Sequence, residues 1–398
     1  MVAGYLFTLN SKDSLEESAG SGLYGTYISE PHGSWMPPGS GTFADYATMK
    51  PGDNVYFFID RRIYGIGELV AVGPDCKYSN FPGASEPMPV DYEATRPAML
   101  ADGRDDRGRY ARWVCLYRPS PHWMRRGVDM DDALSSNPEA FRMLRVIWKL
   151  SFIKFGDDEN QAFRDALLKA NQPALSNPGG AAQRGDVFPD WHERTHLEVE
   201  EKVGRGGYAL NAAPILAASA RGTALTSEMV LEAGIAHQLA SGHPTTTQQM
   251  GEWDYLSHQV VASPFKPVDY MDKMDLFGYA YIPNYRPTIA RYLVAELKKD
   301  TASASDLQQV MKYVDWVKDE YAHGDYSMIR AYLVAHSFND DIGPALEEHG
   351  ERHFTVERRP PRTEKWRNLV LLTYAYDAGA GAVRLSTFGT SRPMLVDF

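Results

Sequence analysis

Hydrophobic residues in the C-terminal half follow strand-like spacing and then helix-like spacing. The runs DKMDLFGYAYI (272–282) and ARYLVAELKKD (290–300) are rich in aromatic and aliphatic residues, which predicts two strands joined by a Pro283-Asn284 turn. A helix with one buried stripe is predicted next, because apolar residues recur three and four positions apart: Leu307, Val310, Met311, Val314, Val317 and Tyr321. With the flanking helix SEMVLEAGIAHQLA and the strand IRAYLVAHSF, the pattern predicts an α/β sandwich with a mixed sheet.

The N-terminal half has a different pattern. GYLFTLN predicts a strand, the Gly-, Ser- and Pro-rich stretch 11–41 predicts a loop, and NVYFFIDRRIYGIGELVAV predicts a hairpin. Gly65 and Gly67 predict a bulge or a close backbone approach within that hairpin. We therefore expect an α+β and α/β multidomain chain with a first domain at 1–171 that ends in a helical extension, a linker and connecting helix at 172–222, and a second domain at 223–398.

Polar residues interrupt the apolar pattern of the second domain at chemically useful positions. Asp275 lies in the first strand, and Glu296 and Lys298 lie in the second. Residues two apart on a strand share a face, so Glu296 and Lys298 point the same way. Two carboxylates on neighbouring strands suit Mg²⁺ or Mn²⁺, and a lysine beside them suits the charge that builds on a phosphate during hydrolysis.

This ordered set resembles the PD-(D/E)xK nuclease superfamily, most closely its RecB-like and NucS-like branch, over about 227–356. The resemblance implies a restriction-endonuclease-like domain in which Asp275 and Glu296 are metal ligands and Lys298 is catalytic. Gln309, in a Gln-x-x-x-Tyr pattern, would be the supporting glutamine. The family's acidic residue on an early helix would be Glu232, in preference to Glu228. The alternative is a solvated strand edge and plain surface residues.

The run KPGDNVYFFIDRRIYGIGELV resembles the EVE branch of the PUA-like β-barrels. That resemblance implies a small barrel whose pocket accepts one extruded, often modified, base. Candidate pocket residues are the aromatics of the loop-like stretch and of the run ARWVCLYRP: Tyr24, Tyr27, Trp35 and Trp113. The alternative is that these side chains belong to the core of the barrel.

A competing motif, His-Glu-x-x-His, occupies His192 to His196. On a helix, His192 and His196 would face one way and hold zinc, with Glu193 as the general base of a metalloprotease. The following residues LEVEEKVGRGG are strongly polar and no third ligand stands at a characteristic spacing. The other interpretation is a polar helix entering the second domain.

Composition narrows the class of protein. The 398 residues carry a formal net charge of −11, which disfavours simple wrapping of nucleic acid. Basic residues nevertheless gather in three short segments, around 104–112, at 125–126 and at 358–367, which makes a local nucleic-acid surface a reasonable expectation against the alternative of solvated faces. Two cysteines, no signal peptide and no long apolar run favour a cytoplasmic protein that does not contact a membrane.

Together these patterns predict a Mg²⁺-dependent endonuclease that acts on double-stranded DNA. Its cleavage would be restriction-like and directed to modified bases, as in antiviral defence, with a homodimer supplying two active sites. The alternatives are a repair nuclease acting on mismatched or branched DNA, a non-catalytic reader with a nuclease fold, and the zinc metalloprotease.

Overall fold

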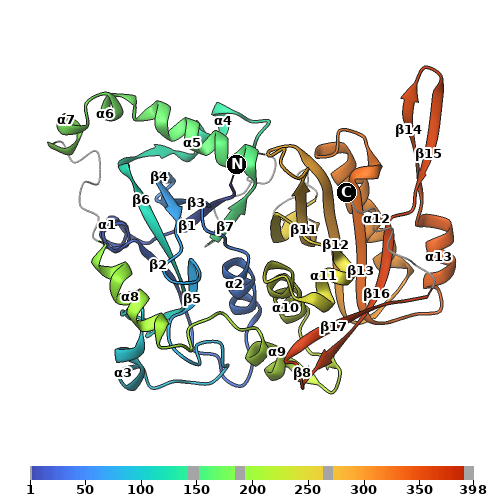
Figure 1. The fold of residues 1–398 in the computed structure, drawn as a ribbon, viewed down its shortest axis with the longest axis horizontal. Helices are drawn as coiled ribbons and strands as arrows, with labels where there is room; N and C mark the ends of the chain where they lie inside the picture. Colours follow the sequence, from blue (N-terminus) through green and yellow to red (C-terminus); the bar gives the residue numbers. More distant parts are fainter. Residues whose placement is uncertain (1, 142–151, 184–192, 263–271, 390–398) are drawn as a thin grey trace. The chain divides into compact units, whose positions relative to one another are not determined.

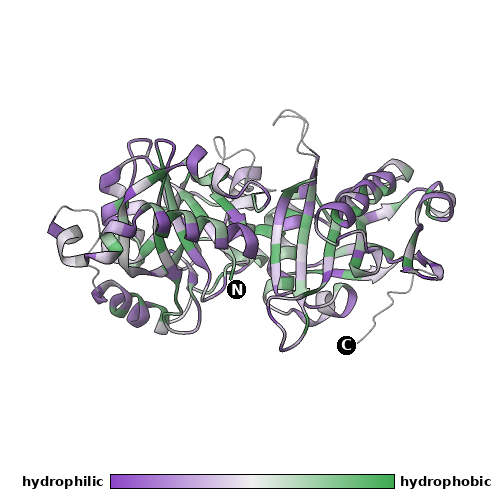
Figure 2. Ribbon diagram, turned by 90° about the horizontal axis from the view of Figure 1, so that it is seen from above, coloured by the Kyte–Doolittle hydropathy of each residue, from purple (hydrophilic) through white to green (hydrophobic). Residues whose placement is uncertain are grey.

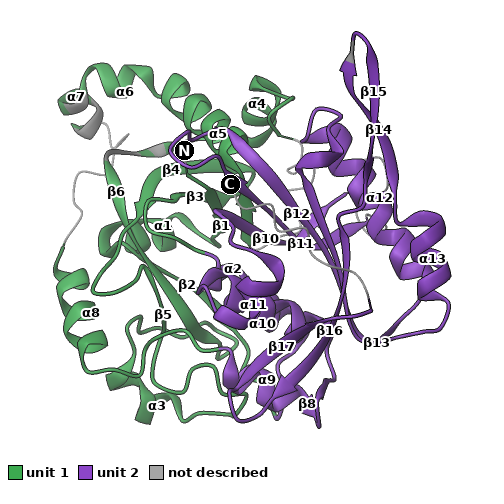
Figure 3. Cartoon of the chain, turned by 45° about the vertical axis from the view of Figure 1, so that its right-hand side comes forward, with its two compact units in different colours: residues 1–32, 49–211 green, residues 33–48, 212–398 purple. Residues whose placement is uncertain are grey.

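The chain divides into two compact units in a computed structural model that describes residues 2–141, 152–183, 193–262 and 272–389. Unit 1 comprises 1–32 and 49–211, and unit 2 comprises 33–48 and 212–398 (Figure 3). A short N-terminal segment, 33–48, is therefore part of the C-terminal unit.

Unit 1 is built on a curved sheet that forms a half-barrel (Figure 1). The strand order is β2-β6-β4-β3-β1-β7, with β5 paired to β6. The long strand β6 extends over 20 residues and pairs with three other strands, which joins the two halves of the sheet. The strands are β1 (Gly4–Thr8), β2 (Leu23–Ile28), β3 (Asn54–Ile59), β4 (Arg62–Leu69), β5 (Lys77–Ser79), β6 (Tyr110–Asp129) and β7 (Phe152–Phe155).

The predicted hairpin is present as β3 and β4. Asp60 and Arg61 form its turn with φ values of 46° and 64°, the left-handed conformation that matches the twist of the two strands. The register shifts where Val55 pairs with Gly67 and Tyr56 pairs with Gly65, which confirms the predicted bulge.

The prediction of a loop over 11–41 was wrong, because this stretch contains α1 (Lys12–Ser21), β2 and the start of α2 (Pro37–Ala47). Helix α1 has local end signals: the Ser11 hydroxyl accepts a hydrogen bond from the Ser14 backbone, and Gly22 ends the helix with φ of 66°. Helix α2 contains two prolines and two glycines, and its packing against α10 outweighs its poor intrinsic propensity.

Further helices complete unit 1. The stretch predicted as a linker contains two of them, α6 and α7, and no structure is described for 184–192. These elements are α3 (Tyr92–Thr95), the 3₁₀ turn Arg96–Ala98, α4 (Met130–Ser136), α5 (Asp157–Ala170), α6 (Gln172–Ser176), α7 (Pro178–Gln183) and α8 (Arg194–Gly204).

Unit 2 contains the predicted sandwich of helices on a mixed sheet. The strand order is β10-β11-β12-β13-β16-β17, and only the β12–β13 and β13–β16 pairs are parallel. In Figures 1 and 3, α10 and α12 lie on opposite sides of this sheet. The strands of the sheet are β10 (Tyr255–Val261), β11 (Lys273–Tyr281), β12 (Ile289–Ala302), β13 (Ile329–Phe338), β16 (Leu369–Asp377) and β17 (Ala382–Thr387).

The remaining elements of unit 2 surround this sheet. They are α9 (Ala213–Ser219), β8 (Ala220–Arg221), β9 (Ala224–Leu225), α10 (Glu228–Ala240), α11 (Pro244–Met250), α12 (Ala304–Glu320), the 3₁₀ turn Tyr326–Met328, α13 (Ile342–His349), β14 (Arg352–Arg358) and β15 (Pro361–Trp366). None of the helices in the described part of the chain is long and apolar enough to span a membrane.

The core of unit 2 lies where the apolar pattern predicts it. The α12 stripe from Leu307 to Val317 is buried against β12 and β13. Figure 2 shows hydrophobic residues along the strands and hydrophilic residues on the outer faces of the helices. Glu232, Asp275 and Glu296 are buried in this apolar unit. Burying these three acidic side chains lowers the stability of the fold, and packing does not explain their presence.

Candidate active site

Asp275 and Glu296 lie side by side where strands β11 and β12 separate. The last ladder pair between these strands is Leu276 with Ala295, so Asp275 and Glu296 occupy the next position. In place of a strand carbonyl, Asp275 Oδ2 accepts a hydrogen bond of 2.7 Å from the Leu297 backbone N–H. The separation of the strands leaves the two carboxylates facing a common space.

Glu296 pairs with the lysine predicted to act beside it. Lys298 Nζ donates to Glu296 Oε1 at 2.7 Å, as expected for two residues on one face of β12. Glu296 is 1% exposed, and its Oε2 atom is buried with no hydrogen-bond partner among the described residues. An unpartnered carboxylate oxygen in the interior is costly, which marks this atom as a candidate for ligand contact.

Glu232 completes the acidic cluster from helix α10. The Gln259 side-chain amide donates to both Glu232 oxygens at 3.0 Å and to Asp275 Oδ1 at 3.1 Å. Gln259 has φ of 52° within strand β10, a conformation that is rare for a residue with a side chain. The strained backbone therefore accompanies an amide that holds two carboxylates together.

A histidine supports Glu232 from the other side. His258 Nε2 donates to Asp45 Oδ1 at 2.9 Å, and its Nδ1 lies 3.8 Å from Glu232 Oε2. Asp45 belongs to α2, and Gly41 on the same helix lies close to His258: a Cβ atom there would meet His258 Cε1 at 3.4 Å, an ordinary van der Waals distance. The segment 33–48 thus contributes to the acidic cluster of unit 2.

The second acidic residue of α10 lies beside the lysine. Glu228 Oε1 is 3.6 Å from Lys298 Nζ, and Asp306 in the first turn of α12 is 4.0 Å away. Both acidic residues that the sequence offers on this helix therefore lie at the site. Glu232 is linked to Asp275 by the Gln259 amide, and Glu228 lies next to Lys298.

Helix α12 carries a polar pair that is joined by a hydrogen bond. Gln309 Nε2 donates to Tyr313 Oη at 2.7 Å, one helical turn away. Burial raises the pKa of Tyr313 above its ordinary value, and the charges of Glu296 and Asp275 raise it further.

Burial and crowding shift the ionisation of the whole cluster. Burial, together with the neighbouring charges of Glu232 and Glu296, raises the pKa of Asp275 well above its usual range. Burial also raises the pKa of Glu296 to about 7, against the lowering influence of Lys298. Burial opposes the charge of His258, but Asp45 and Glu232 outweigh it and raise its pKa to about 10. The cluster concentrates negative charge that two cations offset in part.

The cluster supplies carboxylate oxygens, the donor type that a hard divalent cation takes. As the side chains stand, no three His, Cys, Asp or Glu residues among those described are gathered closely enough to hold an ion. The Gln259 amide lies between Glu232 and Asp275, where its donors satisfy both carboxylates. Carboxylate oxygens are the ligands Mg²⁺ prefers, and Glu296 Oε2 has no competing partner within the described structure.

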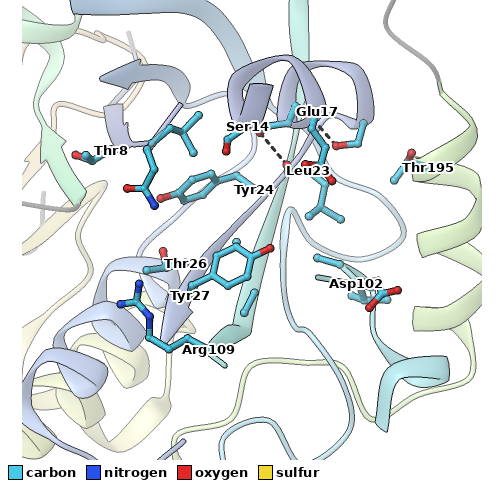
Figure 4. Close-up of a pocket in the computed structure, with 18 residues that line it drawn as sticks. Thr8, Ser14, Glu17, Leu23, Tyr24, Thr26, Tyr27, Asp102, Arg109 and Thr195 are labelled. Atoms are coloured by element: carbon cyan, nitrogen blue, oxygen red, sulfur yellow. Dashed lines mark hydrogen bonds between the residues drawn. The ribbon is translucent and has the colours of Figure 1, made fainter. Parts of the chain in front are cut away.

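Unit 1 contains a cavity of about 430 Å³ between α1, β2 and the segment around Asp102 (Figure 4). This volume is within the range of roughly 300–1,000 Å³ that is common for small-molecule sites. Tyr24 and Tyr27 both line it, together with Arg109. Tyr24 is buried and stacks on Phe7 with ring centroids 4.0 Å apart, whereas Tyr27 is 41% exposed.

The other two candidate pocket residues lie elsewhere. Trp113 is fully buried in unit 1, where its Nε1 donates to Ser85 Oγ at 3.3 Å, and it does not line the cavity. Trp35 is buried within the segment 33–48 of unit 2. Lys50, Gly52 and Asp53, which support the EVE resemblance, form a turn in which the Asp53 carboxylate accepts from the backbone N–H groups of Lys50 and Ala3.

Only part of the zinc motif can be examined, because His192 lies outside the described residues. His196 is buried on α8, and its Nε2 lies 3.0 Å from the Gly22 carbonyl oxygen. Glu193 precedes the helix and lies 3.6 Å from Arg118. Both described residues are therefore engaged in contacts within unit 1.

The basic segments differ in what they contact. In the first, Arg112 is buried and donates to the carbonyl oxygens of Ala84, Glu86 and Met88, so it stabilises the loop 84–88 and offers no surface. In the second, Arg126 is exposed and the Arg125 side chain is outside the described residues. The third segment begins at the last residue of β14 and contains the turn and the whole of β15.

Comparisons with known proteins give only partial likenesses. No family model and no curated protein matches the chain. A repair endonuclease from Pyrococcus abyssi is similar over 30% of this chain and 43% of its own, at 24% identity and a TM-score of 0.21. The structure of an EndoMS–dsDNA complex is similar over 21% of this chain and 30% of its own, at 26% identity and a TM-score of 0.16. The matches span less than half of either protein, so the interpretation of the site rests on its own geometry.

Sequence reasoning missed three residues of the site: Asp45, His258 and Gln259. His258 and Gln259 form a polar pair inside the strand YLSHQVV. This interruption of an apolar run is a sequence signal that indicates candidate site residues. Asp45 has no such signal, because its role depends on α2 packing against a unit that begins about 160 residues later in the sequence.

Replacing Glu296 with glutamine is expected to make thermal stability less dependent on pH. The folded chain raises the pKa of Glu296 to about 7 from an ordinary value of 4.5. The protonated Glu296 carboxyl group therefore contributes its full stabilisation below the pKa that it has in the unfolded chain, and this contribution is lost as the pH rises through 7. In EDTA, the Tm of the wild type should fall by several degrees more than that of Glu296→Gln between about pH 5 and about pH 8.

Circular dichroism melts over this pH range test the prediction. Glu347→Gln, at an exposed position on α13, is the matched control and should retain the wild-type pH profile. Parallel profiles for Glu296→Gln and the wild type would contradict the assignment of the raised pKa to Glu296.

Proposed function

We propose that this chain is a divalent-metal-dependent DNA endonuclease whose active site is the acidic cluster of unit 2. The observation that carries the proposal is the convergence of Asp275, Glu296 and Glu232 with Lys298 at one point of the fold. Three buried carboxylates weaken a folded protein unless a ligand compensates for them. Such a cluster does not favour folding by itself, but it is expected at a site that binds a cation.

Asp275 and Glu296 are the residues that would hold Mg²⁺ or Mn²⁺, with Glu232 adjoining them. When bound, such an ion acts as a Lewis acid on a phosphate and lowers the pKa of a coordinated water. Glu296 Oε2 is the oxygen with no partner among the described residues, since Oε1 of Glu296 is engaged by Lys298. Asp275 Oδ2 is engaged by the backbone, and Oδ1 would take part only if a cation displaced the Gln259 amide that donates to it.

The remaining side chains have roles that follow from their contacts. Burial opposes the charge of Lys298, but Glu296 and Glu228 raise its pKa, so the ammonium group stays charged and is suited to stabilise negative charge on a phosphate oxygen. His258, held by Asp45, orients Glu232. Gln309 orients the Tyr313 hydroxyl beside the cluster.

Mutation of the cluster should abolish DNA cleavage without unfolding the chain. Glu296→Ala and Lys298→Ala are each expected to reduce Mg²⁺-dependent cleavage of plasmid DNA by at least about a hundredfold, the usual effect of removing an electrostatic catalytic group. The measurement is the initial rate of plasmid cleavage on agarose gels, with Tm confirming that each variant is folded.

Lys312→Ala, at an exposed position on the same helix as Gln309, is the matched control and should cleave at the wild-type rate. Cleavage in the presence of EDTA, or cleavage by Glu296→Ala at the wild-type rate, would contradict the proposal. A parallel series with mismatched and branched duplexes distinguishes a repair nuclease from one that cuts intact plasmid.

We further propose that unit 1 is the EVE-like reader of this enzyme and that its cavity accepts an extruded modified base. The support is a cavity of suitable size with one exposed tyrosine, Tyr27, and one buried tyrosine, Tyr24. Flipped bases are commonly stacked on aromatic rings. The proposal makes the enzyme restriction-like, with cleavage of both strands requiring two chains in a homodimer.

Tyr27→Ala should remove selectivity for modified DNA while leaving the cleavage chemistry intact. Loss of one stacking ring costs about 1–3 kcal/mol, so the preference for a plasmid carrying modified cytosines should fall by roughly tenfold or more. Competitive cleavage of modified and unmodified plasmids measures it. Tyr285→Ala removes an exposed tyrosine of unit 2 and is the control. An unchanged preference in Tyr27→Ala would exclude this cavity as the base site.

A further inference from the structure

The β14–β15 hairpin is a basic segment of an acidic chain. Residues 351–367 contain six lysine and arginine residues against three glutamates, although the whole chain carries a net charge of −11. The hairpin extends away from the six-stranded sheet of unit 2 in Figures 1 and 3. Its strands pair only with each other, so both faces of the ribbon are available to a partner.

The base of the hairpin is firmly anchored. Trp366 is buried, and its Nε1 donates to the Ile329 carbonyl oxygen at 3.0 Å. Arg352 makes two hydrogen bonds, of 2.8 and 2.9 Å, to the Asp315 carboxylate on α12. Tyr326 contacts the rings of Phe354 and Trp366. These contacts fix the direction in which the arm leaves the nuclease unit.

The tip has a different character from the base. Arg359 lies exposed in the turn and forms no ion pair with any described residue. Arg362 is 59% exposed and lies near Glu357 and Glu364, and exposed ion pairs of this kind add little to the stability of a protein. Val356 is also exposed, at the point where the hairpin register shifts. The tip therefore presents arginines that a stronger anionic partner can engage at little cost.

The arm is close enough to the acidic cluster to contact the same duplex. The base residue Trp366 bonds to Ile329, which pairs with Tyr292 on β12. Glu296 is four residues farther along β12, a distance on the order of 13 Å. The seven residues of β14 give the arm a length of about 23 Å. Placed end to end, the two distances come to about one turn of B-DNA, which is about 34 Å, so the tip and the cluster can contact one duplex.

We propose that the β14–β15 hairpin is a DNA-binding arm that enters the major groove of the duplex cut by unit 2. This inference rests on the proposed nuclease function. The major groove, about 12 Å wide, admits a two-stranded ribbon. Arg359 and Arg362 contact the phosphates that border the groove, which positions the duplex without reading its sequence.

The test is equilibrium binding of a fluorescent duplex of about 30 base pairs to the full-length protein in EDTA, across a salt series. The double variant Arg359→Ala/Arg362→Ala should bind roughly tenfold more weakly. The slope of log K against log salt should become shallower by about 1.8, since each lost phosphate contact removes about 0.9. The control, Arg221→Ala/Arg384→Ala, removes two exposed arginines from other strands of unit 2 and should bind as the wild type does.

Equal affinity and slope in the hairpin variant and the wild type would overturn the proposal, as would an equal loss in the control or a wild type that binds no duplex. Cleavage of the same duplex in Mg²⁺ is scored separately. A wild type that cleaves while the hairpin variant binds normally refutes the arm and leaves the nuclease. Binding that depends on the hairpin without any cleavage refutes the nuclease and leaves the arm.

Discussion

The crowding of buried carboxylates at the end of the β11–β12 ladder is the constraint on which the rest of unit 2 depends. Like charges in a poorly hydrated interior destabilise the folded state unless cations or hydrogen-bond donors oppose them. The donors are Lys298, the Gln259 amide and the Leu297 backbone N–H, with His258 beside Glu232. Lys298 and Leu297 lie on β12, and Gln259 and His258 lie on β10. The carboxylates come from α10, β11 and β12, so the cluster exists only when these four elements are assembled.

The same constraint gives the segment 33–48 its importance. Asp45 on α2 holds the charged His258 that faces Glu232, so a short N-terminal segment contributes to the electrostatic balance of unit 2. Residues on both sides of 33–48 belong to unit 1, so the chain enters unit 2 at this segment and then returns to unit 1. Under the proposed function, the segment that follows the Tyr24–Tyr27 strand leads directly into the support of the active site.

Much of this arrangement can be predicted from the sequence. Asp275, Glu296 and Lys298 are polar interruptions of strand patterns, and period-two spacing alone places Glu296 and Lys298 on one face. The α12 stripe and the β3–β4 bulge follow from equally local signals. Local signals fail for α2, because its prolines and glycines predict a loop. The helix forms because it packs against α10. They fail also for Arg112, a surface residue by composition that the fold buries among backbone carbonyls. The misses share a cause: each depends on contacts between residues far apart in sequence.

The most direct test of the account is a crystal structure of the protein soaked with Mn²⁺, with anomalous diffraction used to locate the ion. The account predicts an anomalous peak among Glu232, Asp275 and Glu296, lost in a Glu296→Ala crystal. A structure without a peak there at saturating Mn²⁺, in which the Gln259 amide still bridges Glu232 and Asp275, would contradict the claim that this cluster is a metal-dependent catalytic centre.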